Sequence, residues 1–504
     1  MKQNRIVITL FSVTGLALIS KVLGFLKQMT MADLFGATLE TDLINLSQGF
    51  ISDTQYLLVQ SLLTSLVTVY IYTKEEGEDA AKRFAFAVWK AFTLVSAGVV
   101  AVITLASPLL ARLLAPTYSA HNSASLSRYL RLFAPLLFFF VWIAIFNALL
   151  HASKRFIPGE MTNIYMNALS LGCMLLLHRR LGLTSLVLGF FVHAVWNTVY
   201  LAFLSRRCWT VSRGNPFRDP SVRRLLRMMV PLLIGYSLVY VNQMVDKILV
   251  SGLAAGTVTA LTYSAVLSNL VTAFIERFST IFFPYVTDRI SRKDDEGAAA
   301  LANRTALLMV TVFLPVSILT VLCAKDIVTI VYGRGAFGAD SVAVCARALV
   351  GYGFIFVPLV LREVYSRFIY AYQDSRRPMV NSSIGIACNI ALSILLCRRY
   401  GVIGVTAATS FAVAVCGVLN MRSAKAHNTA LQYGVLLRPL PWLLAGSAAC
   451  TLVALWGLRF FAGQGSLVRF VLTAISGILA YGVVISPLLL RLWRSYFKSK
   501  KANE

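Results

Sequence analysis

The sequence predicts an all-α polytopic membrane protein, and three observations carry this prediction. The 504 residues are 58% hydrophobic and only 13% charged, with a mean hydropathy of +0.73. A soluble domain carries about 25% charged residues, so this chain has too little polar surface for a water-soluble globule. Apolar runs of about twenty residues, enough to cross a bilayer as a helix, recur along the whole chain. The short alternating strands typical of a membrane β-barrel are not apparent.

About fourteen membrane helices are predicted from the apolar windows. The expected spans are residues 6–27, 40–73, 83–113, 129–151, 157–178, 183–205, 223–252, 258–288, 300–332, 342–372, 377–397, 402–421, 437–459 and 468–493. In lipid every backbone polar group must be bonded within its segment, which favours helices. The first run, Ile6 to Leu26, lacks a small-residue cleavage site, so we expect a helix there and not a removed signal peptide.

The basic residues predict the orientation of the chain. The formal net charge of +26 would indicate a nucleic-acid partner if the protein were soluble. Here Lys and Arg gather in short connections, in the pairs Arg206-Arg207, Arg223-Arg224, Arg292-Lys293, Arg376-Arg377 and Lys500-Lys501. This is the positive-inside pattern, together with attraction to anionic membrane lipids, so no nucleic acid is expected. Because the number of spans is even and the basic loops lie on the side of the chain ends, both termini are predicted to be cytoplasmic.

The chain matches itself at an offset of about 219 residues. Arg179-Arg180-Leu181-Gly182 corresponds to Arg398-Arg399-Tyr400-Gly401, and the segment 153–158 corresponds to 373–378 within one residue. The repeat predicts two six-helix lobes, residues 1–205 and 223–430, joined by a basic cytoplasmic linker at 206–222. Two lobes in the same orientation are related by an axis along the membrane normal, and transporters of this kind bind substrate between them. Residues 431–504 lie outside the repeat and hold two additional helices and a basic tail.

Ionisable side chains inside the predicted spans are costly in lipid and therefore indicate function. The candidate substrate-binding cations are Lys21, Lys27, Lys247, Arg277, Arg362 and Arg367. The candidate supporting or coupling residues are Gln28, Asp42, Asp53, Asn242, Asp246, Glu276 and Glu363. More cations than anions predict a net-basic cavity, which suits a phosphate or pyrophosphate head group. The alternatives are structural ion pairs for adjacent charges, and snorkelling to the interface for Lys27, which is near a helix end.

Several patterns that would indicate other chemistry are absent or misleading. The eight cysteines form no CxxC pair and are expected to be small apolar residues without a disulfide or metal role. Gly333 to Gly338 satisfies G-x-G-x-x-G, but it joins two membrane helices and has no βαβ unit around it. The five histidines lack metal-ligand spacing, and no nucleophile–base arrangement is visible. No enzyme activity, cofactor or metal is therefore expected.

Four blocks of the sequence carry a resemblance to a known family. They are Ser20 to Lys27 followed by Leu34 to Ala37 and Thr41-Asp42; Val241 to Asp246; Val331 to Phe337 followed by Ala346 to Leu349; and Ala371 to Pro378. Together they resemble the lipid II flippase family (MviN/MurJ) of the multidrug/oligosaccharidyl-lipid/polysaccharide exporter superfamily, over nearly the whole chain. The resemblance implies a flippase for a polyprenyl-pyrophosphate-linked glycan, with the peptidoglycan precursor lipid II as the leading substrate, in the bacterial cytoplasmic membrane. It also implies that the two C-terminal helices form a groove for the polyprenyl tail.

The chain departs from the family pattern at its cations. The family's Arg-Asp pair at the end of the first helix is Lys27-Gln28 here, and Lys lacks the bidentate fork of Arg. The arginines expected in helices two and eight fall near Gln55 and Val266. Three alternatives stay open: a flippase for another lipid-linked oligosaccharide, a cation-coupled multidrug exporter, and a membrane scaffold for cell-wall enzymes. A coupling ion or the membrane potential is a possible partner of transport.

Overall fold

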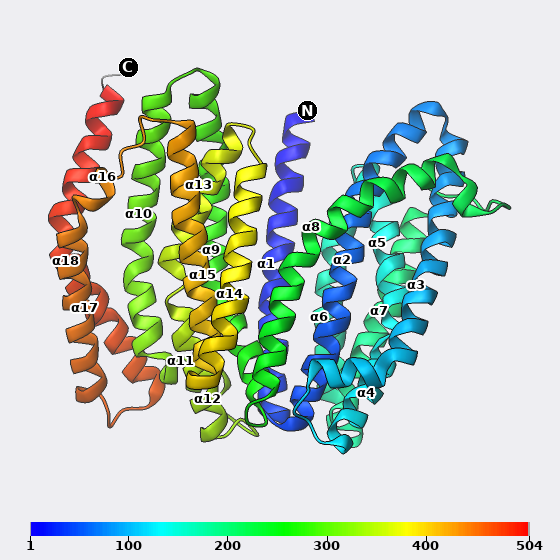
Figure 1. The fold of residues 1–504 in the computed structure, drawn as a ribbon, viewed down its shortest axis with the longest axis horizontal. Helices are drawn as coiled ribbons and strands as arrows, with labels where there is room; N and C mark the ends of the chain where they lie inside the picture. Colours follow the sequence, from blue (N-terminus) through cyan, green and yellow to red (C-terminus); the bar gives the residue numbers. More distant parts are fainter. Residues whose placement is uncertain (1, 502–504) are drawn as a thin grey trace. The chain divides into compact units, whose positions relative to one another are not determined.

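The structure is a computed structural model that describes the backbone of residues 2–501 and the side chains of residues 15–233, 237–238 and 240–488. Over these residues the chain is helical and has no strand (Figure 1). The helices are α1 (Lys2–Phe35), α2 (Leu39–Glu76), α3 (Glu78–Leu114), α4 (Ala120–Phe133), α5 (Leu136–Ala152), α6 (Ile157–Leu181), α7 (Thr184–Ser205), η1 (Pro216–Arg218), α8 (Pro220–Ser251), α9 (Thr257–Ser291), α10 (Asp295–Leu322), α11 (Ala324–Tyr332), α12 (Ala339–Gly353), α13 (Phe356–Ala371), α14 (Arg376–Tyr400), α15 (Val402–His427), α16 (Gly434–Leu437), α17 (Leu440–Phe460) and α18 (Ser466–Lys501).

Every predicted span falls on one helix or on two consecutive helices, so the all-α class is confirmed. Ten helical segments of the described chain are long and apolar enough to cross a membrane, or eleven if α12 and α13, which are bent by 41°, form one span. Helices α1, α6 and α8 do not meet the same length and hydropathy condition over their described residues. The multi-pass character is therefore confirmed, whereas the count of fourteen spans is not.

The chain divides into two compact units. The first contains residues 1–259 and 335–337, and the second contains residues 260–334 and 338–504. The connection 206–219 is folded onto α3 within the first unit, because Lys90 Nζ donates to the carbonyls of Ser212 (2.9 Å) and Gly214 (2.8 Å). The lobes at 1–205 and 223–430 and the linker at 206–222 stay predictions of the sequence repeat.

Small residues let the helices approach closely in both units. In lipid there is no hydrophobic driving force between helices, so close van der Waals packing at small residues is expected to hold them together. In the second unit Gly351 of α12 lies against Thr406 of α15, so that a methyl group on Gly351 would collide with the threonine hydroxyl. Gly446 of α17 similarly leaves room for Ile485 and Tyr481 of α18. Helices α17 and α18 lie side by side and share an apolar core with α10 (Figure 1).

Local backbone features recur at the offset found in the sequence. Lys154 (φ 59°) and Gln373 (φ 61°) are both left-handed and precede α6 and α14. Gly182 (φ 53°) and Gly401 (φ 61°) end these two helices in the same way. A non-glycine residue rarely adopts positive φ, so the shared conformation of Lys154 and Gln373 supports a true repeat of the helix–turn–helix unit.

Candidate functional site

An ion pair joins α2 to α8 in the first unit. Lys247 Nζ lies 2.9 Å from Asp53 Oδ2, and the two side chains are 21% and 14% exposed. Gly49 lies one turn before Asp53, and a methyl group on it would stand 2.7 Å from Lys247 Nζ. The absent side chain at position 49 therefore makes room for the ammonium group. Lys247 is a paired cation in this structure, and its partner is the candidate coupling residue Asp53.

An aromatic contact lies beside this ion pair on the same two helices. Tyr56 of α2 and Tyr240 of α8 have ring centroids 5.1 Å apart. The candidate residues Asn242 and Asp246 also lie on α8, where Asn242 is half-buried and Asp246 is buried. We call the set Asp53, Tyr56, Tyr240 and Lys247 the α2–α8 seam. It is a polar and aromatic strip within the first unit.

Asp42 anchors the start of α9 to α2. It is 1% exposed, and its carboxylate accepts from the backbone N–H of Gly256 (2.7 Å) and of Thr259 (2.7 Å) and from the Thr259 hydroxyl (2.6 Å). Asn45 donates to the same Thr259 hydroxyl at 3.0 Å. A carboxylate placed at a helix N-terminus satisfies backbone donors that have no partner within the helix. Asp42 thus has a structural role in this structure that explains its burial.

The glycine-rich segment 333–338 also has a structural explanation. Ala336 donates its backbone N–H to the carbonyl of Asp33 at 2.8 Å, and Gly335 is left-handed (φ 54°). Gly36, also left-handed, leaves space for the carbonyl of Ala336. Segment 335–337 is therefore held against the α1–α2 turn within the first unit, and the glycines permit this close approach.

The two lysines of α1 lie in different surroundings. Lys21 is exposed, whereas Lys27 places its ammonium 5.4 Å from the centroid of the Phe190 ring on α7. The buried His193 flanks the same ring at 5.8 Å. Helical geometry separates residues six positions apart by about 120° around the axis, so the divergence is expected. Gln28 Oε1 is buried and has no hydrogen-bond partner among the described residues.

Three charged side chains of α13 form a triad in the second unit. Arg362 Nη2 and Nε lie 2.8 Å and 3.2 Å from Glu363 Oε1, and Arg367 Nη2 lies 3.9 Å from Glu363 Oε2. The carboxylate is 12% exposed, and the two guanidinium side chains are 33% and 34% exposed. The structure thus joins three of the predicted residues, and the triad keeps one net positive charge.

The remaining pair, Glu276 and Arg277, lies on an exposed face of α9. Within the described part of the chain neither residue takes part in an ion pair. Phe274 and Phe278 are exposed beside them, at 64% and 52%. The candidate residues therefore form separate groups, the seam and Asp42 in the first unit and the triad in the second, and the single cavity that would hold them all stays a prediction.

Sequence reasoning missed a second buried ion pair. Arg469 of α18 binds Asp326 of α11 through Nε, at 2.9 Å from Oδ2 and 3.1 Å from Oδ1, and through Nη2. Asp326 is 3% exposed. Both residues lie within predicted spans, so the rule that selected the other intramembrane charges applies to them as well.

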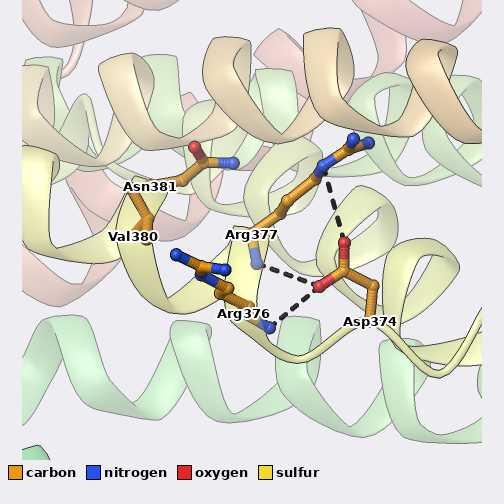
Figure 2. A pocket seen from close by; sticks show the side chains of 5 residues that line it. All are labelled: Asp374, Arg376, Arg377, Val380 and Asn381. Carbon is orange, nitrogen blue, oxygen red and sulfur yellow. Dashed lines mark hydrogen bonds and ion pairs between the residues drawn. The ribbon is translucent and has the colours of Figure 1, made fainter.

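Sequence reasoning also missed a pocket at the start of α14. Its volume is about 390 Å³, and its lining residues are Asp374, Arg376, Arg377, Val380 and Asn381 (Figure 2). The carboxylate of Asp374 accepts the backbone N–H groups of Arg376 (2.9 Å) and Arg377 (3.1 Å). The basic pair Arg376-Arg377 was visible in the sequence, but His427 of α15, which Arg377 contacts, is 50 positions away.

Comparison with known sequences gives one consistent result. A family model described as lipid II flippase MurJ matches residues 31–476. A probable lipid II flippase MurJ of Treponema pallidum (strain Nichols) is 22% identical over 471 residues, covering 88% of this chain and 87% of the relative. The probable lipid II flippase MurJ of Rhizobium tropici is 25% identical over 460 residues, covering 88% and 84%.

Comparison with solved structures agrees on the fold. A lipid II flippase MurJ in an inward closed conformation has a TM-score of 0.81 at 19% identity, over 95% of this chain and 99% of that chain. An inward-facing multidrug resistance transporter of the MATE family, in the MOP superfamily, has a TM-score of 0.61 at 12% identity, over 81% and 98%. At these identities the likeness concerns the fold alone.

Proposed function

Because the chain belongs to the lipid II flippase MurJ family, we propose that it moves a polyprenyl-pyrophosphate-linked glycan across the bacterial cytoplasmic membrane, with lipid II as the leading substrate. The substrate would pass from the cytoplasmic to the outer leaflet by alternating access. The observation within the structure that supports an anionic substrate best is the triad of Arg362, Glu363 and Arg367. This transport step needs no covalent chemistry in the chain, and we do not propose an enzyme.

The triad suits a diphosphate because of its charge and its geometry. Two guanidinium groups share one carboxylate, so one positive charge is left for a ligand. A guanidinium offers a planar fork of donors that matches phosphate oxygens in pairs. Arg367 Nε is buried without a hydrogen-bond partner among the described residues, so Arg367 has a donor left over. A cation-coupled drug exporter would instead need surplus carboxylates for a cationic drug, which makes that alternative weaker.

The other predicted cations take different parts in this proposal. Lys21 and Arg277 are exposed and have room for a phosphate group. Lys247 is held by Asp53, so we propose that the substrate competes with this carboxylate for the ammonium group. Lys27 faces α7, and a direct contact with substrate would need α1 to turn.

The two-lobe arrangement is part of the proposal. The recurrence of left-handed turns at Lys154 and Gln373 and of helix ends at Gly182 and Gly401 supports two copies of one helical unit. Alternating access would rock one lobe, 1–205, against the other, 223–430. Both termini would be cytoplasmic, as the distribution of Lys and Arg indicates. A coupling ion or the membrane potential would supply the driving force.

We further propose that α17 and α18 hold the polyprenyl tail. Both helices expose large apolar side chains, among them Leu444, Leu452, Trp456 and Phe460 on α17. The ion pair between Asp326 and Arg469 fixes α18 to α11 in the second unit. An apolar surface held in place by a buried ion pair suits a long hydrocarbon chain.

The test is transport of labelled lipid II in proteoliposomes, with Arg362→Gln and Arg367→Gln compared at equal protein content in the membrane. We expect each variant to lose at least roughly tenfold in rate, because a charge-assisted hydrogen bond to phosphate contributes about 1.5–3 kcal/mol. Arg179→Gln removes an exposed arginine outside the triad and is the matched control. Normal transport in both triad variants would show that the triad does not bind the head group.

A further inference from the structure

The pocket at the start of α14 contains two arginines and one carboxylate that already accepts hydrogen bonds. Asp374 accepts two backbone N–H groups, and its Oδ2 lies 3.5 Å from Arg377 Nε (Figure 2). The backbone N–H of Arg377 is the main cause that lowers the pKa of this carboxyl group below its ordinary value. Asp374 therefore stays ionised near neutral pH. Arg376 takes part in no ion pair within the described part of the chain.

His427, at the end of α15, contacts this group through both ring nitrogens. Its Nε2 lies 3.1 Å from Asp374 Oδ2. Its Nδ1 lies 3.0 Å from Arg377 Nη1 and also 2.9 Å from the carbonyl oxygen of Ser423. The imidazole thus contacts both the acid and one of the two arginines, which also contact each other.

The two contacts of Nδ1 require opposite protonation states. A guanidinium only donates and a carbonyl oxygen only accepts, so Nδ1 cannot satisfy both at once. In the neutral ring with its hydrogen on Nε2, Nδ1 accepts from Arg377 while Nε2 donates to Asp374. In the protonated ring, Nδ1 donates to the Ser423 carbonyl and Nε2 still donates to Asp374. The Arg377 guanidinium then loses its acceptor and faces a like charge.

The groups around His427 hold its ring in place, so we expect Nδ1 to change its hydrogen-bond partner from Arg377 to Ser423 without a movement of the ring. The Tyr372 ring lies tilted against the imidazole, with ring centroids 5.6 Å apart, and the tyrosine donates its hydroxyl hydrogen to Asp295 Oδ1 at 2.7 Å. Asn428 donates to the Tyr372 hydroxyl at 3.0 Å. The ring is therefore held by a tyrosine that is itself fixed to the start of α10, whereas the arginine side chain is long and 47% exposed.

We propose that this pocket binds a phosphate-type oxyanion, and that protonation of His427 releases Arg377 to bind it together with Arg376. After protonation Asp374 keeps a cationic partner in His427, so its charge is balanced without Arg377. The pocket then has two guanidinium groups for a doubly charged anion, whereas the Asn381 amide already donates to Asn420 and Ser423. Histidine is the side chain whose ordinary titration falls between about pH 5 and 8. The binding is therefore expected to strengthen as the solution becomes mildly acidic. This inference does not depend on the transported substrate.

The anion could be the phosphate of a membrane lipid or a free phosphate group. Both present the same oxygens to the two arginines, so the structure identifies the shared chemistry. Sulfate is the better first probe, because its charge is constant between pH 6 and 8 whereas inorganic phosphate itself titrates there. A change in sulfate affinity over this range then reports on the protein.

The experiment measures sulfate binding by calorimetry to the full chain in a neutral detergent at pH 6 and pH 8. We expect binding to be roughly tenfold tighter at pH 6, within the usual 5- to 150-fold range of coupling between two sites. His427→Gln should bind weakly at both values, because the amide cannot become charged. His427→Lys should bind tightly at both. Arg376→Gln should lose binding, and Arg179→Gln, an exposed site elsewhere, should not change it.

Three outcomes would overturn the proposal. They are equal sulfate affinity at both pH values in the native chain, unchanged pH dependence in His427→Gln, and unchanged binding in Arg376→Gln. Thermal unfolding at pH 8 without sulfate shows whether each variant is folded. A second arm then compares short-chain phosphatidylglycerol with short-chain phosphatidylcholine at pH 6. Displacement of sulfate by phosphatidylglycerol alone identifies a lipid phosphate as the ligand, whereas displacement by neither lipid identifies a free anion.

Discussion

Arg469 of α18 and Asp326 of α11 form a bidentate ion pair whose carboxylate is 3% exposed. The pair joins α18, one of the two additional C-terminal helices, to α11 within the second unit. A buried charge that loses its partner is far more costly than the pair is stabilising, because desolvation is no longer compensated. The stability of this junction should therefore respond differently to single and double substitutions.

We predict that Arg469→Met destabilises the protein by about 3–5 kcal/mol, since it leaves Asp326 buried and unpaired. The double variant Asp326→Leu/Arg469→Met should regain most of this loss, because two apolar side chains need no partner. Thermal unfolding in detergent measures both. Arg459→Met, an exposed site at the end of α17, is the control. A double variant as unstable as the single one would mean that packing, and not charge, dominates this junction.

The second prediction concerns the space that Gly49 leaves for Lys247. In Gly49→Ala the new methyl group would stand 2.7 Å from Lys247 Nζ and would displace the ammonium from Asp53. The far end of a lysine moves easily, so we expect a small change in melting temperature but a clear change in transport rate. Gly98→Ala, where nothing lies within 4 Å, is the matched control. Equal transport by the two alanine variants would count against a role for the Lys247–Asp53 pair.

The third prediction concerns Asp42 as an anchor for α9. Asp42→Ala leaves the N–H groups of Gly256 and Thr259 without an acceptor, at about 1–3 kcal/mol for each buried group. Asp42→Asn keeps one acceptor oxygen and should lose less. Chemical unfolding measures the difference, with Glu75→Ala, exposed on the same helix, as the control. If the two Asp42 variants are as stable as the native chain, the carboxylate is not the anchor.

The fourth prediction is a pH dependence at the start of α10. The backbone N–H of Gly297, with a further contribution from Arg289, lowers the pKa of Asp294 below its ordinary value of 3.8. A lowered folded-state pKa gives stability that is present above the unfolded-state value and lost as the pH falls through the folded-state value. Below about pH 4 the native chain should therefore lose stability more steeply than Asp294→Asn. Parallel curves for melting temperature against pH would rule out this contribution.

The positions of the helices could largely be predicted from the sequence, whereas the breaks inside four of the predicted spans could not. Spans follow from apolar length, and the repeat located the equivalent ends of α6 and α14 at Gly182 and Gly401. These features depend on local composition and on comparison of the chain with itself. The conformations of Lys154 and Gln373 could not be predicted, because neither residue type favours positive φ.

The partners of the charged residues could only partly be predicted. The Arg362–Glu363 contact lies within one helix, and adjacent charges made an ion pair there an open alternative. Lys247 and Asp53 are 194 positions apart, and no pattern in a single sequence relates them. Asp326 and Arg469 were visible as intramembrane charges, yet their pairing depends on how α18 packs on α11. His427 was likewise visible, but its role depends on which atoms face each ring nitrogen.

The docked connection before α8 limits how far that helix can travel. Because Lys90 holds the carbonyls of Ser212 and Gly214, only residues 215–219 separate a point fixed on α3 from the start of α8. Five residues reach at most roughly 17 Å when fully extended. The connection therefore limits the distance between α3 and the start of α8. A larger displacement of the start of α8 from α3 must first break the two hydrogen bonds that Lys90 donates. This lysine therefore limits the range of conformational change during transport.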